Sequence, residues 1–470
     1  MTHKTPLPPP EKSMAPGIFK IAAVASLGSF LAQLDATMVN VALANLVQEF
    51  REPVSLLQWV VTAYLLALML ALPLSGYLAD RIGIKALYLW CVAGFAVTAF
   101  LCGLAWSARS LIVLRLFQGA AGGLLAPMAQ MMIARAAGGR LASVAGYVAI
   151  PILLGPILGP ILASGLLHYL SWHWLFFFTS SVAVLTLVLA AVLIPADRRE
   201  DLKPRRMDWA GFALLAPALA LLLYSLDHMA GIQGRLLLGV AVVLFLLFTL
   251  HARRRKNDSL VNLELFRHRS FRISAMTQFI TNGINFAGQM LIPMFLIVGC
   301  RRPPGEIGWL MAPLGIGMMC SYPFLSHIIR RFGLRRVASA GAFMSLAAMT
   351  ILAFTATREL SLAFLWPALL LLGAGQGAVG LSSMTAAYTS ISADDIPMAT
   401  TSLNICQRLG GPVLTTVSAV FLDWRMAVSG RMSIPFGAFS TTFLGLCVVL
   451  FLCFLATFWL PKRASENSPR

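Results

Sequence analysis

The chain has 470 residues, of which 59% are hydrophobic and 11% are charged, and its mean hydropathy is +0.81. This balance excludes a soluble globular domain and indicates a polytopic membrane protein, because each membrane-spanning helix needs about 20 mostly apolar residues. The net charge of +18 could suggest a nucleic-acid-binding protein. With the N-terminus placed inside, however, most lysine and arginine residues fall in cytoplasmic tails and loops, which is the positive-inside bias of a membrane protein.

Fourteen apolar segments are long enough to cross a bilayer. Residues 1–17 precede them as a proline-rich segment, which we expect to form a disordered cytoplasmic tail, and residues 461–470 form a second one. The first apolar run is too long for a cleavable signal. The predicted spans lie near 18–46, 55–79, 86–106, 110–134, 142–167, 173–194, 207–227, 235–251, 271–298, 305–327, 337–356, 361–390, 399–422 and 436–460.

The first span holds Asp35, the one carboxylate in the middle of a predicted membrane segment, together with Gln33 and Asn40. An acid at that depth is costly unless it has a partner or holds a proton. We therefore predict that Asp35 carries the coupling proton and that Gln33 and Asn40 line a substrate cavity. The alternative is a structural acid tied to a neighbouring helix.

The second span ends in a tight cytoplasmic turn that runs from Gly76 to Lys85. Its small residues allow close helix approach, and its acid can accept hydrogen bonds from a neighbouring helix N-terminus or an arginine. A state-dependent latch needs this arrangement, whereas the alternative is a solvated turn. The predicted switch residues are Gly76, Asp80, Arg81, Gly83 and Lys85.

The fourth span places Arg115, Gln118 and Gly119 on one helix face, followed by Gly122 and Gly123. An arginine at that depth needs an anion, and Asp35 is the only mid-membrane candidate. We therefore predict that Arg115 takes part in proton coupling and that Gln118 faces the cavity. Asp35 is the candidate partner of Arg115, whereas the alternative is a structural arginine, and the sequence leaves a direct pair between them open.

The fifth span carries a face of small residues that includes Gly155 and Gly159 and is followed by Pro160. Such a face packs tightly against another helix, and the proline allows a bend. These three residues are therefore predicted to belong to the conformational switch.

A repeat relates the two halves of the chain. Two copies of a six-helix unit in the same orientation imply an axis along the membrane normal and a binding site between the halves near the midplane. We therefore predict an N-terminal half at 18–194, a linker with two inserted helices at 195–269 and a C-terminal half at 270–460. The residues Trp59, Pro73, Arg81, Gly83 and Lys85 recur at constant spacing as Trp309, Pro323, Arg331, Gly333 and Arg335.

The second half offers amides in place of an acid, because the spacing of the repeat places Asn285 where the first half has Asp35. Coupling chemistry should therefore be asymmetric. The ninth span carries four amides on one face, which either line a wet cavity or cross-link helices. We favour the cavity, because polar groups at membrane depth tend to face interior water or partners. The predicted cavity amides of this half are Gln278, Asn282, Asn285, Gln289, Gln376, Asn404 and Gln407.

Several classes of function lack their motifs. No Gly-Lys pair occurs, so there is no P-loop for ATP, and nothing resembles a catalytic triad. The seven histidines show no metal spacing, and the seven cysteines have no paired spacing and are expected to be free thiols. We expect no enzyme activity, no metal and no cofactor.

Local motifs resemble the major facilitator superfamily. The turn from Gly76 to Lys85 resembles its loop 2-3 signature, with Ile84 where arginine is usual. The fifth span resembles the antiporter motif of drug exporters, G-x8-G-x3-G-P-x2-G-G, with Ala163-Ser164 in place of the last glycine pair. The stretches Leu34–Leu43 and Ser171–Phe176 resemble the 14-span drug:proton antiporter-2 branch, the EmrB/QacA type, and within it MdtD-type proteins, although Ala44 stands where proline is usual.

This resemblance implies an all-α major facilitator fold of two six-helix halves plus two inserted helices. It implies a proton-coupled antiporter that exports drug-like or metabolite-like small amphipathic molecules by alternating access. The expected partners are a small-molecule substrate, protons and membrane lipid, with no nucleic acid. We expect a monomer in the bacterial inner membrane with both termini cytoplasmic, and a periplasmic adaptor is not readable from the sequence. The alternatives are an uptake or facilitated-diffusion transporter of a metabolite, or a membrane sensor with the same fold.

Overall fold

The computed structural model is helical throughout the part of the chain that it describes, and no strand occurs among these residues. The described residues are 16–137, 154–155, 158–159, 161–197, 207–227, 229, 231–255, 259–302, 306–356, 362–392, 395–428 and 436–462.

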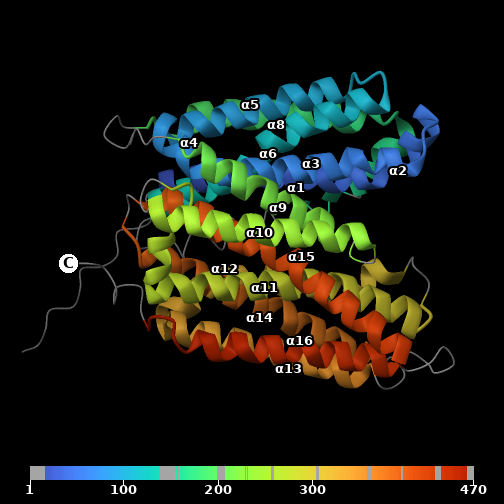
Figure 1. Cartoon of the computed structure of the whole chain (residues 1–470), viewed down its shortest axis with the longest axis vertical. Coiled ribbons are helices and arrows are strands. Elements are labelled where there is room, and N and C mark those ends of the chain that lie inside the picture. The colour runs from blue at the N-terminus through green and yellow to red at the C-terminus, as the bar shows by residue number, and fades with distance from the viewer. Residues whose placement is uncertain are drawn as a thin grey trace, which may run out of the picture.

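The N-terminal half occupies one side of the molecule (Figure 1). Pro73 falls in the short 3-10 segment Leu72–Leu74, which separates two helices of the second span. Residues 161–169 of the fifth span are also helical. The helices of this half are α1 (Pro16–Phe50), α2 (Val54–Leu57), α3 (Trp59–Ala71), α4 (Ser75–Ile82), α5 (Ile84–Cys102), α6 (Ala108–Ala137) and α8 (His173–Leu193).

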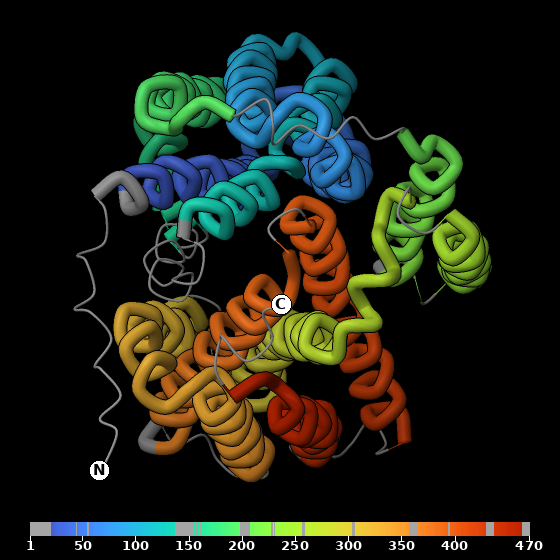
Figure 2. The backbone as a smooth tube through the Cα atoms, turned by 90° about the vertical axis from the view of Figure 1, so that its left-hand side faces the viewer, coloured from blue at the N-terminus to red at the C-terminus, as the bar shows by residue number. Residues whose placement is uncertain are grey.

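The C-terminal half lies against the first, and the inserted pair sits at one edge of the seam between them (Figure 2). The inserted helices are α9 (Trp209–Asp227) and α10 (Ile232–Arg255). The C-terminal half contains α11 (Arg269–Met294), which continues as a π-helical turn to Gly299, α12 (Ile307–Phe332), α13 (Leu334–Thr355), α14 (Leu362–Thr389), α15 (Ile396–Val428) and α16 (Phe436–Thr457).

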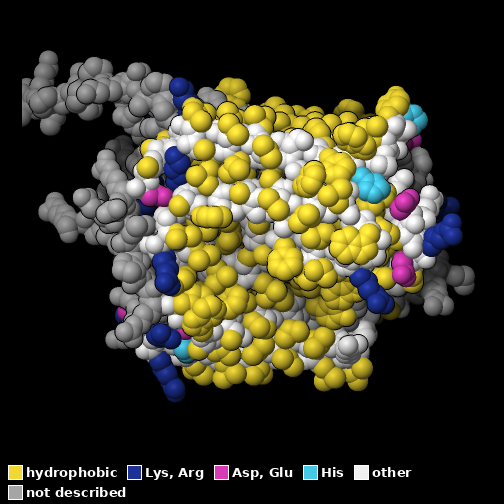
Figure 3. All heavy atoms as spheres, turned by 90° about the horizontal axis from the view of Figure 1, so that it is seen from above, with side chains coloured by type: hydrophobic (Ala, Val, Ile, Leu, Met, Phe, Trp, Pro, Cys, Tyr) yellow, Lys and Arg dark blue, Asp and Glu magenta, His cyan; other side chains and the backbone are white. Residues whose placement is uncertain are grey.

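Thirteen helices in the described ranges are long and apolar enough to cross a membrane. They correspond to thirteen of the predicted spans, including the inserted pair. The remaining prediction, 142–167, falls mostly outside the described residues. The side of the molecule in Figure 3 is mainly hydrophobic, with lysine and arginine gathered near its two ends. This distribution suits a bilayer, because charged side chains stay in water while apolar ones meet the hydrocarbon.

The inserted pair is fastened by one buried carboxylate at the start of α9. Asp208 accepts hydrogen bonds from the backbone N–H groups of Gly211 (2.9 Å) and Leu260 (3.2 Å), from His251 Nε2 (2.8 Å) and from Arg255 Nη1 (3.1 Å). Burial opposes the charge, but these hydrogen bonds outweigh it and lower the pKa of Asp208. Its stabilising effect is therefore present at neutral pH and is lost only as the pH falls through that lowered pKa.

The repeat appears as two matching turns. Gly83 joins α4 to α5 with φ 91° and ψ 155°, and Gly333 joins α12 to α13 with φ 86° and ψ 159°. Only glycine adopts this backbone without strain. Both turns lie at the same end of the bundle, which we call the Gly83 end.

A carboxylate caps the first of these turns. Asp197 accepts hydrogen bonds from the backbone N–H groups of Ile84 (3.2 Å), Lys85 (2.9 Å) and Ala86 (3.2 Å). These groups have no partner within the helix, and the helix N-terminus favours negative charge. Asp197 therefore ties the segment after α8 to the start of α5.

We predict that Asp197→Ala lowers the free energy of unfolding by about 0.5–2 kcal/mol, because the first turn of α5 loses its cap. Thermal unfolding of the purified variant in detergent measures this loss. Glu52→Gln, which removes an exposed acid in another loop, is the control and should leave the melting temperature unchanged. Equal melting temperatures for Asp197→Ala and Glu52→Gln would contradict the capping role.

Candidate functional site

An ion pair between α1 and α6 is buried within the N-terminal half. Arg115 Nη1 donates to Asp35 Oδ2 at 2.5 Å, and the side chains are 0% and 1% exposed. Gln118 completes a triangle, because its Nε2 donates to Asp35 Oδ1 (3.1 Å) and its Oε1 accepts from Arg115 Nη1 (2.8 Å). Arg115 Nε donates to the Val60 carbonyl (3.1 Å), and the guanidinium lies 4.1 Å from the Tyr64 ring centroid. We call Asp35, Arg115 and Gln118 the buried triad.

Glycines bring α3 close enough to complete this environment. A Cβ on Gly119 would collide with the carbonyl of Tyr64, and one on Gly123 would lie 2.5 Å from the carbonyl of Leu68. The backbones of α3 and α6 therefore touch along this face. This contact places the α3 carbonyls and the Tyr64 ring around Arg115.

The electrostatics of the triad make its members interdependent. A buried pair is held by mutual attraction that offsets the cost of removing both charges from water. Removal of one partner leaves an uncompensated buried charge and typically costs about 3–5 kcal/mol. Both oxygens of Asp35 accept hydrogen bonds within the triad.

The predicted cavity amides of the first half differ in exposure. Gln33 and Asn40 are exposed on α1. Gln118 is completely buried in the triad and reaches no cavity in this conformation. The expectation that Gln118 faces the cavity is therefore corrected, because two charged groups occupy its polar atoms.

The four amides on one face of α11 also differ in their environment, because two of them bind backbone carbonyls of other helices and two do not. Gln278 Nε2 donates to the Gly380 carbonyl at 2.8 Å, and Asn282 Nδ2 donates to the Gln407 carbonyl at 2.6 Å. These two amides cross-link helices. Gln278 is also buried, so the alternative describes it in this conformation, whereas Asn282 is half-buried and its place in a cavity stays a prediction. Asn285 is half-buried and Gln289 is exposed, and the two side chains share a hydrogen bond of 3.0 Å.

The remaining amides have three different environments. Gln407 is half-buried on α15. Asn404 is buried, and its Nδ2 donates to Gln130 Oε1 of α6 at 2.7 Å, so it joins the two halves. Gln376 is 2% exposed, and within the described part of the chain neither polar atom of its side chain has a partner. The cavity expectation is thus also corrected for Asn404 and Gln376 in this conformation.

Hydrogen bonds join the two halves toward the Gly83 end. Besides the bond from Asn404, Gln130 Oε1 accepts from the Tyr388 hydroxyl at 3.4 Å. Ser75 Oγ lies 2.8 Å from Thr401 Oγ1. The sequence did not identify these contacts between the halves, although polar residues in apolar spans were a usable signal. The residues missed are Ser75, Gln130, Tyr388 and Thr401.

The predicted switch residues of the turn from Gly76 to Lys85 lie at this end. A Cβ on Gly76 would lie 2.8 Å from Thr401 Oγ1, so α4 touches α15 directly. Asp80 is buried near the end of α4, and Arg81 Nη1 donates to the Tyr77 hydroxyl at 2.5 Å. Lys85 Nζ donates to backbone carbonyls at the end of α8.

The small face of the fifth span packs on α1, close to the buried triad. A Cβ on Gly155 would lie 2.9 Å from the Cβ of Gln33, and one on Gly159 would lie 2.9 Å from the Cβ of Thr37. Pro160 lies outside the described residues. Any movement of α1 therefore has to be accommodated by the fifth span.

Comparisons with known proteins agree with this architecture. The profile of the Major Facilitator Superfamily matches residues 25–415 and 303–470. A "Multidrug resistance protein B homolog" from Mycobacterium tuberculosis is 30% identical over 417 residues, which cover 87% of this chain and 77% of that protein. A "Putative multidrug resistance protein MdtD" from Escherichia coli is 29% identical over 430 residues, which cover 90% of this chain and 89% of that protein.

Among solved structures, the human organic anion transporter MFSD10 (TETRAN) superimposes with a TM-score of 0.63. The match covers 93% of this chain and 100% of that chain at 18% identity. At that level of identity the likeness concerns the fold.

Gln118 and Gln376 provide a matched test, because the stretch Gln118–Gly122 of the first half recurs as Gln376–Gly380 in the second. We predict that Gln118→Met lowers the free energy of unfolding by about 2 kcal/mol or more, because it removes hydrogen bonds to two charged groups. Gln376→Met should leave stability unchanged or raise it by about 1 kcal/mol, because an unpartnered buried amide is replaced by an apolar side chain of similar size. Melting temperatures in detergent measure both effects. A loss for Gln376→Met as large as that for Gln118→Met would show that the Gln376 amide has a partner.

Proposed function

This chain belongs to the major facilitator superfamily, and we propose that it is a proton-coupled antiporter that exports drug-like or metabolite-like small amphipathic molecules. The buried pair of Asp35 and Arg115 carries the proposal. The multidrug resistance proteins from Mycobacterium tuberculosis and Escherichia coli support the substrate class, because they match this chain over most of its length.

The energetics of the triad support the proposal of proton coupling. A proton that reaches Asp35 neutralises the carboxylate and leaves the Arg115 guanidinium buried without its counter-ion. Because an unpaired buried charge is unfavourable, the paired arrangement of α1 and α6 is no longer the stable one. Protonation therefore favours a different packing of α1, and the fifth span adjusts through the contacts of Gly155 and Gly159 with α1.

Alternating access needs a seam that closes at one end and opens at the other. In the described conformation the halves are joined at the Gly83 end by Asn404 with Gln130 and by Ser75 with Thr401. We assign this end to the cytoplasm of a bacterial inner membrane, because α10 and α12 end there in clusters of arginine. The conformation is then closed toward the cytoplasm.

We assign the substrate contacts to the amides that remain accessible. Gln33 and Asn40 on α1 and Asn285 and Gln289 on α11 retain exposure, and Phe286 beside them is 49% exposed. Amides and an aromatic ring suit amphipathic molecules, because a few polar groups orient a ligand that is held mainly by apolar contact. Substrate and proton each favour one packing of the helices, so their fluxes are linked by a coupling free energy.

The first test removes the proton carrier. Asp35→Asn should abolish proton-driven efflux, because an amide of the same size cannot carry the proton. A panel of drugs first identifies an exported compound in cells, and uptake of that compound into everted vesicles with an imposed proton gradient measures the effect. Glu49→Gln, which removes an exposed acid from the same helix, should transport normally.

Loss of transport could also reflect damage to the fold, because Asp35→Asn leaves Arg115 unpaired. The double variant Asp35→Asn/Arg115→Gln removes both charges and should recover thermal stability without recovering transport. Gradient-driven export by either variant at the parent rate would refute the coupling role of Asp35.

The second test weakens the closed end. Asn404→Leu should increase the reactivity of a Leu403→Cys probe toward a water-soluble thiol reagent by about threefold to tenfold in a Cys-free background, because one buried hydrogen bond contributes about 0.5–1.5 kcal/mol. Gln130→Leu should act similarly, and the double variant should add little further, because both single changes break the same contact. Fully additive effects, or unchanged labelling, would mean that this contact does not hold the end closed.

A further inference from the structure

The two turns of the repeat have the same backbone but opposite electrostatic character. In the first copy, Asp80 and Asp197 balance Arg81 and Lys85. The Asp197 carboxylate lies on the backbone N–H groups that begin α5 and approaches Gly83 closely. The first turn therefore contains its own anion.

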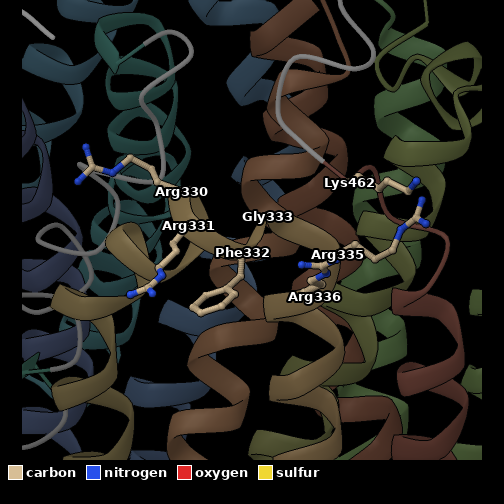
Figure 4. A pocket seen from close by; sticks show the side chains of 7 residues that line it. All are labelled: Arg330, Arg331, Phe332, Gly333, Arg335, Arg336 and Lys462. Carbon is tan, nitrogen blue, oxygen red and sulfur yellow. The ribbon is translucent and has the colours of Figure 1, made fainter. Parts of the chain in front are cut away.

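The second copy has a base in place of the first acid and a backbone carbonyl in place of the second. Arg330 stands where the first copy has Asp80, and the carbonyl of Lys462 approaches Gly333 where the Asp197 carboxylate approaches Gly83. A pocket of about 510 Å³ opens at this turn, and the described residues that line it include no acid. Figure 4 shows Arg330 and Arg331 on one side of Gly333 and the other three cations on its opposite side. The lining residues are Arg330, Arg331, Phe332, Gly333, Arg335, Arg336 and Lys462.

The cations of this pocket differ in what they already bind. Arg335 Nε donates to the Leu460 carbonyl at 2.7 Å, as Lys85 does to the end of α8, so Arg335 has a structural partner. The side chains of Arg331 and Arg336 are exposed, and Arg331 lies 5.4 Å from the Phe332 ring centroid. These two guanidinium groups are therefore available to an anion.

The start of α13 adds a second source of positive potential. Its first backbone N–H groups, those of 334–336, receive no side-chain acceptor from the described residues, in contrast to the groups that Asp197 caps in the first copy. A helix N-terminus of this kind attracts negative charge, and arginine beside it binds phosphate oxygens with two parallel hydrogen bonds. The pocket has the chemistry of a phosphate site.

The surroundings distinguish a lipid from a soluble ion. Phe324, Ile328 and Arg331 recur at helical spacing on α12, and Arg336 and Phe343 are seven residues apart on α13. All five side chains are exposed. The cations thus continue an exposed apolar surface of α12 and α13, which suits contact with lipid chains. A volume of about 510 Å³ also exceeds the needs of a single inorganic phosphate and fits a headgroup.

We propose that this pocket binds the anionic headgroup of a membrane phospholipid, whose phosphate lies between the exposed guanidinium groups of Arg331 and Arg336 beside the start of α13. The lipid adds negative charge to a pocket whose described lining residues include no acid. The two turns then differ in their ligands, because a carboxylate of the chain caps the first turn and a lipid phosphate binds beside the second.

The experiment measures lipid retention by the whole chain. Native mass spectrometry of the delipidated protein in detergent, titrated with phosphatidylglycerol, should show binding at least about tenfold tighter than with phosphatidylcholine. Arg331→Gln/Arg336→Gln should weaken phosphatidylglycerol binding by about 25-fold, since each basic residue contributes roughly a factor of five to the attraction of an anionic lipid. Thermal unfolding without lipid checks that this variant is folded.

A matched control removes equal charge elsewhere at the same end. Arg253→Gln/Arg254→Gln alters two exposed cations at the end of α10 and should change binding less than twofold. Equal losses in both double variants would overturn the proposal, because the lipid would then respond to general charge.

Two further outcomes would also overturn it. If inorganic phosphate displaced phosphatidylglycerol at equal concentration, the pocket would be a site for the free ion. If phosphatidylglycerol bound only after Glu466→Gln, a carboxylate of the C-terminal segment would be the normal occupant of the pocket. Preferential binding of phosphatidylglycerol that Arg331→Gln/Arg336→Gln abolishes and the control retains would support the lipid site.

Discussion

The burial of Asp35 opposite Arg115 is the constraint on which the N-terminal half depends. No water is available in the bilayer core to satisfy either charge, so the protein itself must supply every partner. The α3 helix approaches closely over Gly119 and Gly123 and provides the Val60 carbonyl. The same pair that stabilises this packing makes it sensitive to a single proton, because neutralising one member leaves the other charge buried without a counter-ion.

The two copies of the repeat share one helical scaffold but differ in the polar and charged residues at equivalent positions. Asn285 stands at the place of Asp35, and Gly373 stands three residues before Gln376 as Arg115 stands three before Gln118. With both charged partners gone, the amide of Gln376 remains buried without a described partner. The duplicated turns diverge in the same manner, because Gly83 and Gly333 have the same backbone angles while the charges around them differ. Shared geometry therefore does not imply shared function between the halves.

The inserted helices lie beside the two halves. The α9 helix contacts α3 at the edge of the seam, where Trp59 stacks on Tyr224 with ring centroids 6.4 Å apart. The α10 helix leaves most of its side chains exposed, which suits a lipid-facing position. Asp208 fastens the pair at its Gly83 end through four hydrogen bonds, so the insertion behaves as one unit beside the two halves.

The sequence by itself determined the spans, the repeat, the inserted pair and the presence of one acid and one arginine at membrane depth in the first half. Hydropathy fixes spans because the bilayer has a set thickness. The tertiary structure decided that Asp35 and Arg115 form a direct pair, because only the packing of α1 on α6 brings the two side chains together. Periodicity also placed four amides on one face of α11, but it could not tell which neighbour that face meets. The tertiary structure decided that Gln278 and Asn282 bind backbone carbonyls while Asn285 and Gln289 stay accessible. The contact of Asn404 with Gln130 likewise joins residues far apart in the chain, and such pairs depend on how the halves pack and not on any local pattern.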